Sequence, residues 1–129
     1  MNILLDTHIF LWFISGDAHL PVWMKQPISD LGNEVYLSAV SLWEIIVKYQ
    51  LGKLPLPQPP EIYIPEQRRR HLITNLPLDE ASVTKLAGLP PLHRDPFDRM
   101  LICQAQEQGL LIATVDPQIQ AYPVALLRT

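Results

Sequence analysis

The sequence is poor in charge, in cysteine and in long apolar runs, and each shortage excludes a class of protein. Charged residues make up 18% of the chain and apolar residues 48%, which excludes a disordered or highly charged tail protein. The single cysteine, Cys103, excludes an intramolecular disulfide, and the histidines show no spacing suited to a structural zinc. No apolar run approaches the roughly 18 residues of a membrane span. We therefore expect a folded cytoplasmic protein that contacts no membrane.

The length and the apolar pattern predict the fold class. A chain of 129 residues fits one domain, residues 1–129, with room for a real core. Short apolar runs predict strands at about 2–6, 34–40, 72–78, 110–116 and 123–129. Helices are predicted over 41–51, 79–89 and 96–109, with another that begins after Pro60 or Pro65. This alternation predicts an α/β three-layer sandwich with a mainly parallel, roughly five-stranded central sheet flanked by helices.

Two aspartates stand at the carboxyl ends of predicted strands. Asp6 follows the first strand and Asp116 ends the strand at 110–116. In open α/β sheets, ligands bind beyond the carboxyl ends of the strands. An aspartate before a helix is also a good amino-terminal cap, and Pro117 suits a first helical turn. For either residue alone, the cap is the favoured interpretation.

The stretch HRDPFDRM, residues 93–100, places two more carboxylates at the start of a helix. Asp95 before Pro96 is interpreted as the cap. Asp98 lies at helical spacing from three apolar residues and so falls inside the buried stripe: Leu101, Ile102 and Ala105. An isolated ionised carboxylate costs several kcal/mol or more to bury. Asp98 must therefore be protonated, paired with a cation such as Arg94, or bound to a metal.

Glu44 has two interpretations. Ser41 and Glu44 match a capping box, and Glu44 with Lys48 matches a surface ion pair one helical turn apart. However, the helix is apolar on most of its circumference, so little of it looks free to face water. Glu44 also follows a strand end by a few residues and could reach the edge of the sheet where Asp6 and Asp116 lie.

A gathering of acids at one edge of a sheet favours metal chemistry. Neighbouring carboxylates repel one another and destabilise a fold unless cations intervene. Carboxylate oxygens without histidine or cysteine ligands select hard ions, so Mg²⁺ or Mn²⁺ is expected. Such ions bridge carboxylates to phosphate oxygens and activate water for attack on a phosphodiester. Phosphoryl chemistry is therefore the leading reaction class.

Four segments carry a resemblance to a known family: LLDTHIFLW, YLSAVSLWEI, LPPLHRDPFDRMLICQA and LIATVDPQIQAY. Their order and spacing resemble the PIN-domain ribonucleases, and more narrowly the VapC-type toxins of bacterial toxin–antitoxin pairs. The resemblance implies a PIN fold and a metal-dependent endoribonuclease activity. It also implies a catalytic and metal-binding acidic site at Asp6, Glu44, Asp98 and Asp116. Asp116 is the least regular of these, because Ile119 stands where the family commonly has a bulky aromatic residue.

The resemblance also implies partners: an RNA substrate, a cognate antitoxin, a second copy of the chain in a homodimer, and DNA only indirectly through the antitoxin complex. RNA must approach a cluster of negative charge, which requires basic neighbours. The densest basic run, Arg68–Arg70, is either a solvated face or an RNA contact. The alternative function is a PIN domain with weak or lost catalysis that serves as an antitoxin-binding module.

Overall fold

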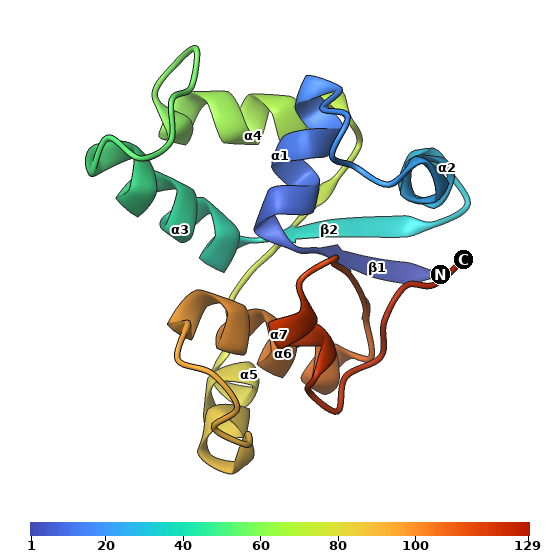
Figure 1. Cartoon of the computed structure of the whole chain (residues 1–129), viewed down its shortest axis with the longest axis vertical. Coiled ribbons are helices and arrows are strands. Elements are labelled where there is room, and N and C mark those ends of the chain that lie inside the picture. Colours follow the sequence, from blue (N-terminus) through green and yellow to red (C-terminus); the bar gives the residue numbers. More distant parts are fainter.

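The computed structural model of the protein describes residues Met1–Thr129 as one parallel sheet between layers of helices (Figure 1). Its four strands lie in the order β3-β2-β1-β4, and all neighbouring pairs are parallel. The strands are β1 (Asn2–Leu5), β2 (Glu34–Ser38), β3 (Thr74–Leu76) and β4 (Leu111–Ala113). The predicted α/β class and parallel sheet are confirmed.

The helices form the two outer layers. They are α1 (Thr7–Ser15), α2 (Val22–Ser29), α3 (Ala39–Gln50), α4 (Pro60–Arg70), α5 (Glu80–Lys85), α6 (Pro96–Gln108) and α7 (Pro117–Gln120), with a 3-10 turn at Leu86–Gly88. Helices α1, α2 and α4 lie on one side of the sheet and α5, α6 and α7 on the other (Figure 1). Helix α3 projects from the end of β2 and packs against both α4 and α6. None of the helices combines the length and apolarity needed to span a bilayer.

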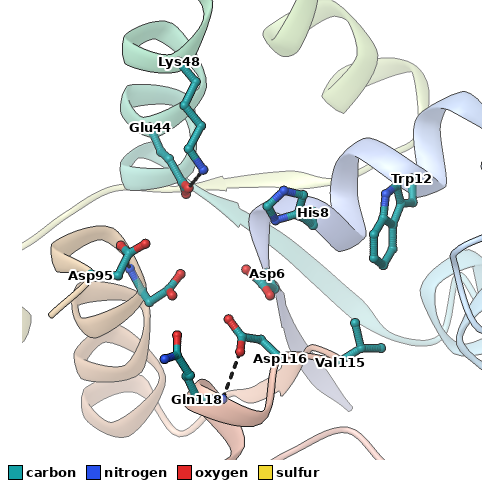
Figure 2. Close-up of a pocket in the computed structure, with 10 residues that line it drawn as sticks. Asp6, His8, Trp12, Glu44, Lys48, Asp95, Val115, Asp116 and Gln118 are labelled. Atoms are coloured by element: carbon teal, nitrogen blue, oxygen red, sulfur yellow. Dashed lines mark hydrogen bonds and ion pairs between the residues drawn. The ribbon is translucent and has the colours of Figure 1, made fainter. Parts of the chain in front are cut away.

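The central strand β1 brings distant parts of the chain to one edge of the sheet. Ile3 is in register with Val35 of β2 and with Leu111 of β4, so these strands end side by side. Asp6, directly after β1, donates its backbone N–H to the carbonyl of Ala113 at 3.0 Å. The first turns of α3, α6 and α7 open at the same edge (Figure 2). This edge is where the predicted acidic site should lie.

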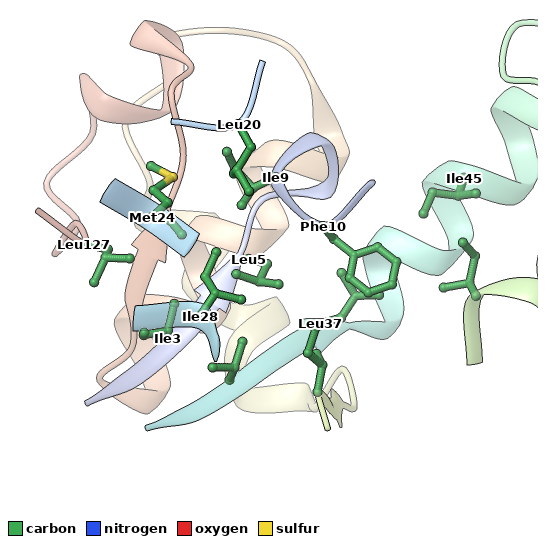
Figure 3. Close-up of a cluster of buried hydrophobic side chains, with 14 residues drawn as sticks. Ile3, Leu5, Ile9, Phe10, Leu20, Met24, Ile28, Leu37, Ile45 and Leu127 are labelled. Atoms are coloured by element: carbon green, nitrogen blue, oxygen red, sulfur yellow. The ribbon is translucent and has the colours of Figure 1, made fainter. Parts of the chain in front are cut away.

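Strand β1 is buried on both faces, as its continuous apolar run predicts. Ile3 and Leu5 belong to the larger apolar cluster, which they share with residues of α1, α2 and β2 (Figure 3). Leu4 points to the opposite face and packs with residues of α6, including Leu101 and Ile102. Two cores therefore fix the strand that carries Asp6.

The predicted helix starts are largely confirmed. Asp79 accepts a hydrogen bond from the backbone N–H of Ser82 and so caps α5. Asp95 caps α6, and Gly109 ends that helix in the left-handed conformation with φ of 67°. The proline-rich segment becomes helical at Pro60, where the missing N–H is not needed.

The predicted fifth strand at 123–129 is wrong. The structure has only an isolated bridge there, between Ile112 and Leu126. Pro123 has no N–H to donate, and the N–H of Val124 turns back to the carbonyl of Tyr122 at 2.8 Å. The pairing therefore reduces to two hydrogen bonds around Ile112, and the sheet has four strands.

The predicted start of α3 at Ser41 is also wrong. The strand ends at Ser38, whose hydroxyl accepts a hydrogen bond from the N–H of Val40 and caps the helix, which begins at Ala39. Ser41 is therefore inside the helix, and the capping box that it would have formed with Glu44 does not exist. Ser38 also donates to the side-chain carbonyl of Gln104, which joins β2 to α6 inside the protein.

Replacing Ser38 with alanine should destabilise the fold, because it removes the cap of α3 and leaves the buried carbonyl of Gln104 without its donor. The expected cost is about 1–3 kcal/mol in the free energy of unfolding. Urea unfolding of S38A measures it. Ser15, whose exposed hydroxyl only contacts its own helix, is the matched control, and a loss in S15A equal to that in S38A would contradict the proposed role.

Candidate active site

The four predicted acids line a single cavity at the carboxyl edge of the sheet (Figure 2). The cavity has a volume of about 340 Å³ and lies between α1, α3, α6 and the start of α7. Its polar lining comprises Asp6, Glu44, Asp98 and Asp116 together with Asp95, His8, Lys48 and Gln118. Carboxylates that are far apart in the sequence thus line one cavity, where their negative charges repel one another.

Asp6 is held by a threonine and not by its own helix. It occupies the position before α1, but its side chain makes no capping hydrogen bond. Its Oδ2 accepts a hydrogen bond from Thr114 Oγ1 at 2.8 Å. Burial raises the pKa of Asp6, and the Thr114 hydrogen bond and the nearby His8 offset part of that effect. The cap interpretation therefore fails for Asp6, and one carboxylate oxygen is left to face the cavity.

Glu44 is 3% exposed, which excludes the solvated surface pair that its spacing suggested. Thr7 Oγ1 donates to its Oε1 at 2.8 Å, and the ammonium of Lys48 donates to its Oε2. The ion pair one helical turn apart does form, but it lies at the wall of the cavity. Both oxygens of Glu44 consequently have a protein partner.

Asp98 lies on the buried face of α6 with Leu101, Ile102 and Ala105, as the helical spacing predicts. Its partner is not Arg94 but His93, whose Nε2 lies 3.2 Å from Asp98 Oδ2. Burial and the charge of Asp95 raise the pKa of Asp98 to about 7, with smaller contributions from Asp6 and Glu44. Without a metal, this carboxyl is therefore largely protonated below neutral pH.

The remaining two acids begin helices at the rim of the cavity. Asp95 Oδ1 accepts hydrogen bonds from the N–H groups of Phe97 and Asp98, at 2.9 and 3.0 Å. Asp116 Oδ1 accepts one from the N–H of Gln118 at 2.9 Å. The cap interpretation is thus confirmed for both residues, while the second oxygen of each has no protein hydrogen bond.

The sequence did not predict the side chains behind Asp98. His93 Nδ1 lies 2.8 Å from the hydroxyl of Tyr122, which also accepts a hydrogen bond from Arg99 at 2.9 Å. This network fixes the imidazole that faces Asp98. Tyr122 is 24 residues beyond Asp98 in a turn after α7, and no spacing rule connects the two.

Lys48 supplies the ammonium group of this acidic cavity. Burial alone would lower its pKa, but the hydrogen bond and charge of Glu44, together with the charges of Asp95 and Asp98, raise the pKa overall. The side chain therefore stays charged at neutral pH and neutralises part of the cluster.

The donor set suits a hard and largely hydrated cation. No three acidic, histidine or cysteine side chains lie close enough to hold one ion by protein atoms alone. Zinc and calcium sites need more protein ligands than this, whereas Mg²⁺ is usually bound by one or two carboxylates and keeps several waters. Asp6 and Asp98 each keep an oxygen without a protein hydrogen bond, as do Asp95 and Asp116, whereas both oxygens of Glu44 are engaged.

The model of the PIN domain family matches residues 3–125, nearly the whole chain. This protein belongs to the PIN-domain family. The solved structures similar to this PIN domain include VapBC2 from Rickettsia felis bound to a promoter DNA fragment, with a TM-score of 0.72 and 13% identity over 99% of this chain and 98% of that one. Another is DNA-bound VapBC from Salmonella typhimurium, with a TM-score of 0.71 and 16% identity over 99% and 97%. At such identities the likeness establishes the fold, which is PIN-like as predicted.

A shorter match is closer in sequence. Ribonuclease VapC16 from Mycobacterium tuberculosis is 44% identical over 54 residues. That region is 42% of this chain and 38% of the relative, so the match covers well under half of either protein.

The raised pKa of Asp98 predicts a pH dependence of stability in the presence of a chelator. Between about pH 4 and pH 7 the unfolded chain has released this proton while the folded chain keeps it. The free energy of unfolding should therefore fall with rising pH, by on the order of 1 kcal/mol per pH unit at most from this group. Asp98→Asn removes the contribution, so wild type should lose stability relative to D98N as pH rises. Parallel curves in urea unfolding would contradict the buried, protonated carboxyl.

Proposed function

We propose that this PIN domain is an endoribonuclease that hydrolyses RNA phosphodiester bonds with Mg²⁺ or Mn²⁺. The observation that carries the proposal is the convergence of Asp6, Glu44, Asp98 and Asp116 on one cavity beyond the carboxyl ends of β1 and β4. The partial match to a protein named as a ribonuclease supports the same chemistry. A bound divalent cation would neutralise the cluster, engage a phosphate oxygen and lower the pKa of water.

The residues take different parts in this scheme. Asp6 and Asp98 would hold the ion, and release of the Asp98 proton would accompany loading because a ligand must be ionised. Glu44 and Asp116 would complete the ligand shell or orient the attacking water. Since Thr7 and Lys48 occupy both oxygens of Glu44, its contacts favour the orienting role.

The partners follow from the same family. We infer that a cognate antitoxin neutralises the toxin and that two copies of the chain form a homodimer. We also infer that the protein is cytoplasmic and contacts DNA only through the antitoxin complex. Similar solved structures support the antitoxin partner and the link to DNA: two are VapBC complexes with DNA, and another is a toxin–antitoxin complex from Klebsiella pneumoniae.

Cleavage should depend on the metal and on Asp6. RNA incubated with wild-type protein should be cut with Mg²⁺ or Mn²⁺ and left intact with chelator. The cleavage rate of Asp6→Asn should fall by more than the roughly 10- to 100-fold typical of mutating residues that only hydrogen-bond to metal ligands, because Asp6 is proposed to bind the ion directly. Resolving the RNA fragments on denaturing gels measures both effects.

Asp30→Asn is the matched control, because Asp30 is an exposed aspartate whose side chain only closes a local turn. Equal cleavage by wild type, D6N and D30N under all conditions would refute the metal nuclease. A folded wild type that cuts no RNA with either ion, yet binds its antitoxin, would establish the alternative, a PIN domain that acts as a binding module.

Asp116 allows its structural and chemical roles to be separated. Asparagine is as good a cap as aspartate, so D116N should keep α7 and the free energy of unfolding while removing one charge from the cavity. Cleavage should fall less than in D6N, within about 10- to 100-fold. Activity and urea unfolding are measured together. A D116N protein as inactive as D6N would make Asp116 a principal ligand.

A further inference from the structure

The end of helix α3 holds two lysines beside each other. Gly52 adopts the left-handed conformation with φ of 72°. Its N–H donates to the carbonyl of Tyr49 at 3.0 Å, and the N–H of Lys53 donates to the carbonyl of Lys48 at 2.9 Å. These two bonds define a Schellman turn, which places Lys48 and Lys53 at the positions that frequently make an apolar contact across it. Here the contact is replaced by two like charges.

The two lysines line a second cavity that adjoins the acidic one. Its volume is about 240 Å³, and its polar lining is Thr7, His8, Lys48 and Lys53. His8 and Lys48 line both cavities, so the second space lies next to the first. No carboxylate lines the second cavity. The lining therefore changes from mainly acidic in the cavity around Asp6 to basic in the neighbouring cavity around Lys53.

Lys53 has no acidic partner. Its side chain is exposed, and it takes part in none of the ion pairs of the protein, whereas Lys48 is paired with Glu44. The arginine run on α4 differs in its position, because none of its three arginines lines either cavity. Arg68 donates to the carbonyl of Ile73 and Arg70 pairs with Glu66.

We propose that Lys48 and Lys53 form a subsite for an RNA phosphate next to the one that is cut. This inference rests on the proposed nuclease function and adds the position of the substrate strand. An RNA strand carries a negative charge at every nucleotide, so a phosphate in the acidic cavity brings its neighbour to the adjoining space. Two lysines there would offset the electrostatic repulsion between the RNA strand and the carboxylates. An acidic protein segment has no phosphate to place in the acidic cavity, so nothing would bring its charges to these lysines.

The test measures RNA binding without cleavage. A fluorescent single-stranded RNA of mixed sequence is titrated with the full chain in chelator, and anisotropy gives Kd at several salt concentrations. Lys53→Gln should weaken binding about three- to tenfold at low salt and reduce the slope of log Kd against log salt by about 0.7, the value for one phosphate contact on a single strand. Lys53→Arg should restore both quantities, which shows that charge and not folding is measured.

Lys25→Gln is the control, because Lys25 is exposed on α2, lines neither cavity and should leave Kd and slope unchanged. An unchanged Kd and slope in K53Q, or a wild type that binds no RNA, would overturn the subsite. So would a greater effect of K53Q on binding of a poly-glutamate peptide than of RNA, which would assign the cavity to an acidic partner. If K53Q weakens RNA binding while wild type cuts no RNA with any metal, the nuclease proposal fails, and what stands is a contact between Lys53 and an RNA phosphate with no cleavage site beside it.

Discussion

Repulsion between carboxylates at the end of the central strand is the constraint on which the site depends. Asp6, Glu44 and Asp98 are all at least nine-tenths buried around one cavity, where charges interact strongly. The protein limits the cost in three ways. Asp98 keeps its proton to about pH 7, Lys48 neutralises Glu44, and the threonines donate to Asp6 and Glu44. A bound divalent cation would take the place of the Asp98 proton and compensate the carboxylate charges directly.

The rigidity of β1 explains why the repulsion does not spread the site apart. Ile3, Leu4 and Leu5 are fully buried against two separate apolar clusters, so Asp6 cannot move without opening both. Helix α6 is anchored likewise by Leu101 and Ile102, one turn beyond Asp98. Apolar burial is worth about 25 cal/mol per Å², and several fully buried side chains readily outweigh a few unfavourable charge pairs.

The parts of the structure that could be predicted are those with local causes. Asp95 followed by Pro96 specifies a helix start, and three-residue spacing places Asp98 on the buried face. The parts that could not be predicted depend on contacts between distant residues. Ser38 caps α3 in place of Ser41, and its hydroxyl also reaches Gln104, 66 residues away. Helices α1 and α2 were not predicted, and Pro27 lies inside α2. The strand after Pro123 was predicted although the N–H of Val124 is engaged in a turn.

Capping and chemistry use the same residues at this site, which is why neither interpretation alone describes it. Asp6, Asp95 and Asp116 occupy the positions before α1, α6 and α7, and all line the cavity. A helix amino terminus carries a partial positive charge, so it stabilises a carboxylate whether or not that carboxylate caps it. Two of the three aspartates give one oxygen to the helix and keep the other for the cavity, and Asp6 gives none. The fold thus provides partial positive charge where the carboxylates gather, and that charge helps to keep the acidic cavity stable before any ion binds.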